Sequence, residues 1–191
     1  MASHEIIKLE QNLVKRIGNV IALTDKLLAL NHDKIKIFIA NDHTLVIKGV
    51  IKALENFTNI VFVGQAGSFE EIYDKFNYIR PDILLTDDQM PRTDILNDIP
   101  KIKKLYPDLK IIMHTLGATD TKISEYIDYV NGYIPMSAQI ENYVDGFKKV
   151  QAGNNYFVKN DNLNGKLIQC HVTDDRNEFV SIIKNIISKR V

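Results

Sequence analysis

The sequence predicts an α/β fold with a doubly wound, five-stranded parallel sheet of the flavodoxin-like order 2-1-3-4-5. Short apolar runs alternate with amphipathic stretches of helical period five times between residues 34 and 153. Such regular alternation is typical of parallel strands joined by right-handed helical crossovers. The central run, 83–85, is apolar throughout, as expected for a strand buried on both faces, and it leads into Asp87 and Asp88. Acids at the carboxyl end of such a strand lie where open α/β sheets bind ligands.

Composition predicts a soluble protein of one domain with appendages. Of the 191 residues, 45% are hydrophobic and 25% are charged, and 24 Lys+Arg balance 24 Asp+Glu. The zero net charge argues against a strongly basic nucleic-acid surface. Cys170 is the single cysteine, which excludes an intramolecular disulfide and fits a reducing compartment. No apolar run approaches the length of a membrane span and no signal-peptide pattern is present, so we expect a cytoplasmic protein.

Each predicted strand is a short apolar run followed by polar or turn residues. The first run leads into Asn41-Asp42-His43, and Pro81 prevents a preceding helix from continuing into the third run. Strands are expected at 35–39, 60–63, 83–85, 109–114 and 132–134.

The segments between the strands have apolar residues at helical spacing. Ser68 is a candidate N-cap, and Glu71 three residues later completes a capping box. Pro107 ends the helix before it, and Ser137 is expected to cap the last helix of the domain. Helices are expected at 44–57, 68–79, 93–106, 119–129 and 137–152.

Residues 1–33 are predicted to form one long amphipathic helix, from 4 to 31. Apolar pairs recur every seven residues, as in Ile6-Ile7 and Leu13-Val14, and further apolar residues fill the positions between them. The resulting stripe is wider than a two-position coiled-coil seam. The helix either pairs with another copy or a partner, or packs on its own domain. We favour association, because a helix before a complete domain has no obvious place in that domain's core.

The strand ends bring together groups suited to phosphoryl chemistry. Asp42 and Asp87 follow neighbouring strands of the predicted sheet and would form an oxygen-rich pocket of the kind Mg²⁺ prefers. A carboxylate can attack a phosphoryl group and become an aspartyl phosphate, and the hydroxyl of Thr115 could donate to the bound group. The alternative is that Asp87 and Asp88 only begin a turn.

Residues 34–153 resemble a response-regulator receiver domain, closest to the NarL/FixJ type. The resemblance implies that Asp87 is the phospho-acceptor, three residues before the Met of Met-Pro. Asp42 and the backbone carbonyl of Gln89 would be Mg²⁺ ligands, and Thr115 with Tyr133 would be the switch pair. The matching stretches are Ile39-Ala40-Asn41-Asp42-His43, the run from Pro81 through Thr86-Asp87-Asp88-Gln89-Met90 to Pro91, Lys110-Ile111-Ile112-Met113-His114-Thr115 and Gly132-Tyr133-Ile134-Pro135-Met136-Ser137.

Two residues depart from the family pattern. Asn41 stands where the family has a first acid, which makes it a weak ligand and should weaken Mg²⁺ binding. Met136 falls on the position of the family's lysine, whose ammonium pairs with the acceptor and with the phosphoryl oxygens. A thioether cannot supply that charge, and losing it costs on the order of a few kcal/mol at a phosphoryl site.

Residues 154–191 are too short for the four-helix DNA-binding module that such proteins usually carry. The tail is expected to hold a strand at 166–172 and one helix opened by Thr173-Asp174-Asp175. An apolar stripe that begins at Phe179 is expected to pack on a neighbouring surface or a partner. The start of the helix faintly resembles a LuxR-type module, but no recognition helix follows.

The leading hypothesis is an atypical receiver module of two-component signalling, not an enzyme, which acts through protein contacts with weakened or absent phosphorylation of Asp87. Its expected partners are a sensor histidine kinase or other signalling protein and, through the first helix, a second copy of the chain. Two alternatives remain open: an ordinary response regulator that accepts phosphate on Asp87, and a DNA-binding regulator with a degenerate output domain.

Overall fold

The structure is a computed structural model that describes residues 13–24, 34–116, 120–163 and 166–188. The chain divides into two compact units, Met1–Lys34 and Ile35–Val191. The described part of the first unit, 13–24, is helical, whereas the remainder of the long helix predicted at 4–31 lies outside the described residues. Among the helices that the structure describes, none is long and apolar enough to cross a membrane.

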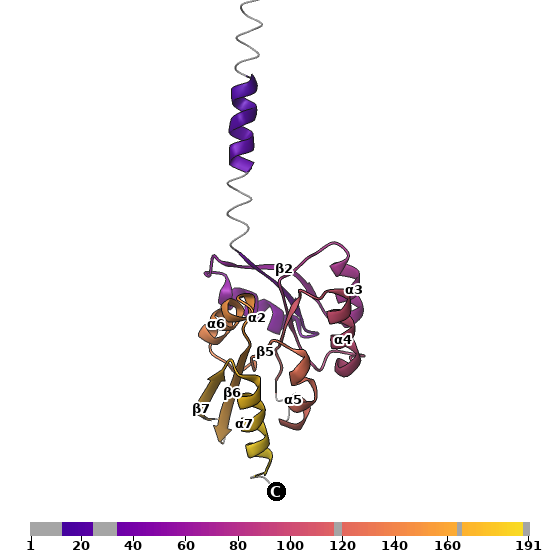
Figure 1. The fold of residues 1–191 in the computed structure, drawn as a ribbon, viewed down its shortest axis with the longest axis vertical. Helices are drawn as coiled ribbons and strands as arrows, with labels where there is room; N and C mark the ends of the chain where they lie inside the picture. The colour runs from indigo at the N-terminus through magenta and orange to yellow at the C-terminus, as the bar shows by residue number, and fades with distance from the viewer. Residues whose placement is uncertain (1–12, 25–33, 117–119, 164–165, 189–191) are drawn as a thin grey trace, which may run out of the picture. The chain divides into compact units, whose positions relative to one another are not determined.

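The second unit is built on one sheet of seven strands in the order β2-β1-β3-β4-β5-β6-β7 (Figure 1). The first five strands have the predicted order 2-1-3-4-5 and are parallel throughout, which confirms the flavodoxin-like class. The strands are β1 (Ile35–Ala40), β2 (Ile60–Ala66), β3 (Ile83–Thr86), β4 (Lys110–Met113), β5 (Gly132–Tyr133), β6 (Tyr156–Leu163) and β7 (Lys166–Thr173).

The prediction of five strands is wrong by two, because the tail extends the sheet. β6 pairs parallel to β5, and β7 returns antiparallel to β6. The predicted strand at 166–172 is therefore present as β7, but β6 was not predicted. Gly132 shows how closely β6 approaches β5, because a Cβ at this position would lie 2.8 Å from the carbonyl oxygen of Tyr156.

Helices cover both faces of the sheet (Figure 1). One core cluster lies between the sheet and α2 and α6, and the other lies between the sheet and α3, α4, α5 and α7. The helical elements are α2 (Thr44–Leu54), α3 (Phe69–Phe76), α4 (Ile95–Leu105), α5 (Asp120–Tyr126), the 3-10 helix η1 (Ile127–Tyr129), α6 (Ile140–Gln151) and α7 (Arg176–Ser188).

The capping predictions have opposite outcomes. Ser68 is the N-cap of α3, and its hydroxyl accepts a hydrogen bond from the amide of Glu71 at 3.3 Å, which is one half of the predicted capping box. The carboxylate of Glu71 accepts from the amide of Gly67 at 3.3 Å. Ser137 does not cap α6, which begins three residues later with Gln139 as its N-cap and no side-chain cap bond. The intervening residues form a turn, in which the amide of Ala138 donates to the carbonyl of Pro135.

The parallel register places the carboxyl ends of four strands at one edge. Ala40 of β1 pairs with Thr86 of β3, Thr86 pairs with Met113 of β4, and Met113 pairs with Tyr133 of β5. The loops that follow β1, β3 and β4 therefore begin next to one another. The acids and hydroxyls that were predicted as site residues lie at this edge.

Candidate functional site

Asp87 and Asp88 lie directly beyond the carboxyl end of β3, where the chain leaves the sheet. The amide of Asp87 still donates to the carbonyl of Ala40 at 3.1 Å, so the first acid is fixed by the neighbouring strand. Each acid is only 5% exposed. Two adjacent carboxyl groups are thus buried at the edge of a sheet, which is costly unless hydrogen bonds or opposite charges compensate.

The hydrogen bonds of Asp87 come from neutral groups. Its Oδ2 accepts from Nδ2 of Asn41 at 2.8 Å, and its Oδ1 accepts from the amide of Gln89 at 3.2 Å. Asn41 is itself held by the turn after β1, because its Oδ1 accepts from the amide of His43 at 2.7 Å. In the described part of the chain no lysine, arginine or histidine forms an ion pair with Asp87.

Thr115 donates to the second acid. Its hydroxyl lies 2.6 Å from Oδ1 of Asp88, and Thr115 has no exposed surface. The same hydroxyl interacts with Asp87 closely enough to lower the pKa of that carboxyl slightly. The predicted acceptor and the predicted switch hydroxyl are therefore neighbours, with Asp88 as the direct hydrogen-bond partner of the hydroxyl.

The surroundings of Asp87 favour its protonated form. Burial is the largest cause of its raised pKa, followed by the side-chain hydrogen bond with Asp88. The negative charge of Asp88 raises the pKa further, while the amide of Gln89 and the hydroxyl of Thr115 act in the opposite direction. A carboxyl group must lose its proton before it can attack phosphorus, so this environment opposes the chemistry expected of the acceptor.

Tyr126, on the last turn of α5, is a residue of the site that sequence reasoning missed. It has no exposed surface, and its hydroxyl has no hydrogen-bond partner among the described atoms. Burial raises the pKa of the phenol, and Asp88, Tyr133 and Asp87 raise it further, so the ring lies within electrostatic reach of all three. The sequence placed it within the helix expected at 119–129 and assigned it no role.

Asp42 contacts the neighbouring histidine. Its Oδ1 lies 2.8 Å from Nδ1 of His43. The described residues contain no group of three or more His, Cys, Asp or Glu side chains that could hold a metal ion. Nδ2 of Asn41 donates to one oxygen of Asp87, and an amide NH₂ cannot be a metal ligand. The predicted Mg²⁺ site of Asp42, Asp87, Asn41 and the Gln89 carbonyl stays a prediction.

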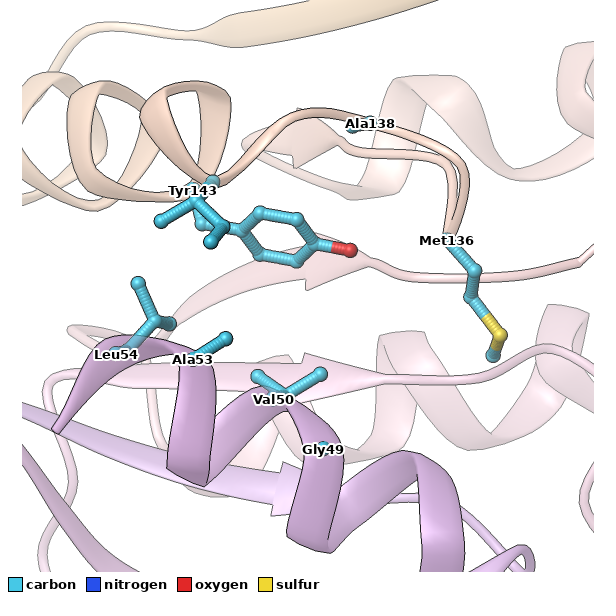
Figure 2. A pocket seen from close by; sticks show the side chains of 8 residues that line it. Gly49, Val50, Ala53, Leu54, Met136, Ala138 and Tyr143 are labelled. Atoms are coloured by element: carbon cyan, nitrogen blue, oxygen red, sulfur yellow. The ribbon is translucent and has the colours of Figure 1, made fainter.

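Met136 lines a different pocket (Figure 2). The side chain extends toward α2 and bounds a pocket of about 180 Å³ between α2, α6 and the loop before α6, while its amide donates to the carbonyl of Thr115 at 3.1 Å. The backbone at the lysine position thus contacts the site, but the side chain contributes an apolar surface elsewhere. The other lining residues are Gly49, Val50, Ala53, Leu54, Ala138, Ile140 and Tyr143.

His114 connects the strand end to this pocket. Its Nε2 lies 2.8 Å from the hydroxyl of Tyr143 on α6, and the two rings pack edge to face with centroids 5.4 Å apart. Burial lowers the pKa of His114 to about 4 and raises the pKa of Tyr143 to about 12. The histidine is therefore neutral at physiological pH, and the pair adds no positive charge to the acids.

Tyr133 is enclosed by the tail of the same chain. It is 4% exposed, and its ring centroid lies 5.9 Å from that of Phe179 on α7. Phe179 also stacks on Phe157 of β6 at 5.1 Å and has no exposed surface. Arg176 fixes the start of α7 with a 2.6 Å hydrogen bond to the carbonyl of Val130. The apolar stripe that begins at Phe179, which was expected to pack on a neighbouring surface or a partner, thus packs over the predicted switch residue.

A parallel sheet of order 2-1-3-4-5 with a buried acid beyond its third strand is the arrangement of a two-component receiver. The chain belongs to the response regulator receiver domain family, whose model matches residues 37–143. This confirms the resemblance to response regulators that the sequence indicated.

Individual relatives cover the same part of the chain. GacA of Pseudomonas syringae pv. syringae (strain B728a), a response regulator, is 30% identical over 123 residues, which are 64% of this chain and 58% of GacA. The response regulator protein VraR of Staphylococcus aureus (strain Mu3) is 28% identical over 124 residues, 64% of this chain and 59% of VraR. The chain thus spans less than two-thirds of the length of these relatives.

Solved structures share the fold. The isolated receiver domain of RcsB from Salmonella enterica serovar Typhimurium, solved with the phosphomimetic BeF₃⁻, superposes with a TM-score of 0.60 at 23% identity and covers 65% of this chain and 93% of that domain. The non-phosphorylated receiver domain of RcsB from Escherichia coli gives 0.62 at 23% identity, with 66% and 99% covered. Another RcsB structure, with a TM-score of 0.61 and covering 65% of this chain and 64% of that one, is described as two dimers bound to DNA.

Proposed function

We propose that this receiver is an atypical signalling module that acts through protein contacts, with weakened or absent phosphorylation of Asp87. The supporting observation is the position of Met136, which stands at the family's lysine and directs its side chain to the pocket beside α2. Asp87 therefore faces Asn41, a backbone amide and a second carboxyl group rather than a cation.

Electrostatics explain why this arrangement disfavours phosphoryl transfer. The reaction gathers negative charge on the phosphoryl oxygens, and protein cations or Mg²⁺ normally stabilise that charge. Here the entering group would meet Asp88 in addition to Asp87. The raised pKa of Asp87, caused first by burial and next by Asp88, further reduces the fraction of the reactive carboxylate. We propose that any Mg²⁺ binding is weak or absent, because Asn41 and Asp42 are engaged with other partners.

The partners we propose are proteins. A sensor histidine kinase or another signalling protein would recognise the receiver surface, and the apolar helix at 13–24 would pair with a second copy. With 24 Lys+Arg against 24 Asp+Glu, the chain lacks the basic excess that favours nucleic-acid binding. We propose a cytoplasmic location, where such partners meet.

Incubation of the full chain with Mg²⁺ and either acetyl phosphate or beryllofluoride tests the proposal. Mass spectrometry of the intact protein should show little or no aspartyl phosphate, and beryllofluoride should not change the solution mass. Full and stable modification of Asp87 together with a change of oligomeric state would overturn the proposal.

Replacement of the thioether by an ammonium is the sharper test. Met136→Lys should raise the extent of labelling by acetyl phosphate about tenfold or more, because it returns a cation to a phosphoryl site where one charge is commonly worth a few kcal/mol. Met136→Gln is the matched control, since it has similar length and no charge, and it should label no better than the original protein. Equal labelling of all three proteins would show that residue 136 does not limit the reaction.

An ordinary phospho-switch is the second candidate. The presence of Asp87 at the end of β3, with the hydroxyl of Thr115 close by, favours it. In that case Asp87→Asn should abolish both labelling and signalling, while Asp145→Asn on the exposed side of α6 should change neither. A signalling phenotype that survives Asp87→Asn would favour the atypical module.

A further inference from the structure

Asp88 has a position for which the family resemblance provides no role. It follows the predicted acceptor, yet it is as buried as the acceptor itself, at 5% exposure. Its Oδ1 takes the hydrogen bond of the Thr115 hydroxyl at 2.6 Å, a short distance typical of a hydroxyl that donates to a charged oxygen. Burial of a carboxyl group has a free-energy cost of desolvation, which an exposed residue at the same turn would not have.

The oxygen of Asp88 provides what a phosphoryl oxygen on Asp87 would provide to Thr115. Both are anionic acceptors beyond the carboxyl end of β3, and both would draw the hydroxyl of Thr115 inward toward the acids. Once the hydroxyl donates to Asp88, its one proton is no longer available to a phosphoryl group. Thr115 also contacts the loop between β5 and α6, because its carbonyl accepts a hydrogen bond from the amide of Met136.

The second member of the predicted switch pair is also held inward. Tyr133 is 4% exposed and pairs across the sheet with Met113, two residues before Thr115. Phe179 of α7 packs against its ring at a centroid distance of 5.9 Å. Both residues of the pair are thus buried.

We propose that Asp88 is a positioning residue that replaces the phosphoryl group toward Thr115, so that Thr115 and Tyr133 are held in their inward arrangement without phosphorylation. The proposal rests on the assignment of these two residues as the switch pair. Asp88 then keeps the surface formed by β5 and α7 in one conformation. Partners bind this constant conformation instead of one that forms only on phosphorylation.

Fluorine NMR of the full chain labelled with 3-fluorotyrosine tests this role. The protein has eight tyrosines, and Tyr133→Phe identifies the signal of Tyr133. Asp88→Ala should shift and broaden that signal, and amides of α7 should exchange with deuterium about tenfold faster, a change that the loss of one hydrogen bond to a charged acceptor is sufficient to cause. Asp88→Asn keeps an acceptor oxygen but removes the negative charge, and it should shift the signal less than Asp88→Ala does.

A matched pair at the donor makes the test independent of how Asp88 variants fold. Thr115→Ser keeps the hydroxyl and should leave the Tyr133 signal in place, whereas Thr115→Val has nearly the same shape without the hydroxyl and should reproduce the Asp88→Ala spectrum. Identical spectra for Thr115→Val and the original protein would overturn the proposal, as would an unchanged Tyr133 signal in Asp88→Ala.

Labelling by acetyl phosphate separates this inference from the proposed function. Stable labelling of the original protein, with a Tyr133 signal that still depends on Asp88, would refute weak phosphorylation but retain the role of Asp88. If the original protein is not labelled and the Tyr133 signal is unchanged in Asp88→Ala, the proposed function is retained and the role of Asp88 is refuted.

Discussion

Asp87 illustrates how a family's reactive residue changes when its neighbours change. Its carboxyl group is hydrogen-bonded by an amide side chain and a backbone amide, and the group beside it is another acid. A lysine at residue 136 would favour the carboxylate, whereas burial and Asp88 favour the carboxylic acid. Beside a cation, Asp87 would be an ionised nucleophile. In this environment its raised pKa favours the protonated form.

The raised pKa of Asp87 predicts a specific pH dependence of stability. The folded state holds a proton on Asp87 at pH values where the unfolded state has already lost it, so the free energy of unfolding falls as pH rises above the ordinary Asp pKa of about 4. Asp87→Asn removes this penalty. We expect a higher midpoint of urea unfolding than the original protein at pH 7, with the difference shrinking as pH falls toward 4.

The control for this measurement is a carboxyl group that folding does not bury. Asp145→Asn on the exposed surface of α6 should leave the free energy of unfolding within about 0.5 kcal/mol of the original at every pH. A loss of stability in Asp87→Asn at pH 7 would mean that the carboxylate is favourably paired, and the account of an uncompensated acid would fail.

His114 predicts the opposite dependence. Burial holds its pKa at about 4, below the ordinary value of about 6.5, so the unfolded state binds a proton that the folded state refuses. Stability should therefore fall as pH drops from about 6.5 to 4, by up to roughly 3 kcal/mol. Urea unfolding of His114→Phe should lose this slope, while Tyr143→Phe, which keeps the buried imidazole, should retain it. A slope that persists in His114→Phe would assign the acid sensitivity to another group.

The sequence identified the site unevenly, for physical reasons. Asp87 and Thr115 follow apolar runs directly, so topology alone brought them to one edge. Asp88 could be seen as a doubled acid, but its contact with Thr115 depends on the side chain's direction after the strand ends. Tyr126 gave no signal, because a buried phenol and a core aromatic have the same helical spacing. Asp42 followed β1 as predicted, and its contact with His43 depended on local turn geometry.

At the scale of elements, the tail is the part that sequence patterns described least well. β6 begins with the apolar run Tyr156-Phe157-Val158 but continues into polar residues, so it has no consistent strand period. Its backbone hydrogen bonds with β5 on one side and β7 on the other hold it as a strand. The five strands of the family fold could be predicted because each is a short apolar run with a clear end.

Phe179 should carry most of the attachment of α7. It is fully buried against Tyr133 and Phe157, and a phenylalanine truncated to alanine in such a core commonly costs about 3–5 kcal/mol. Urea unfolding of Phe179→Ala should show a loss of this size, and hydrogen exchange should show the largest loss of protection in α7 and β6. Val172→Ala, at a position that is 45% exposed, should cost less than about 1 kcal/mol. Comparable losses in the two variants would indicate that α7 is not held through Phe179.

At the scale of the whole molecule, the two units differ in how much of their apolar side-chain surface they bury internally. The unit that begins at Ile35 buries its isoleucines, leucines and aromatics in two cores, one on each face of the sheet. In the helix at 13–24, by contrast, every large apolar side chain is at least half exposed: Leu13, Val14, Ile17, Val20, Ile21 and Leu23. An apolar face of this size is expected to be buried against the second unit, a second copy or a partner.

Self-association through this helix is the final prediction. The solution mass of the full chain, measured by light scattering across a concentration series, should exceed that of one chain. Ile17→Glu combined with Val20→Glu should return it to one chain, because both residues lie on the apolar face and a charge buried there is costly. Lys15→Glu combined with Asn19→Glu changes charge on the polar face and should leave the mass unchanged. If both double variants keep the original mass, the copies associate through another surface. If the original protein has the mass of one chain at every concentration, the apolar face packs on its own domain or on a different protein.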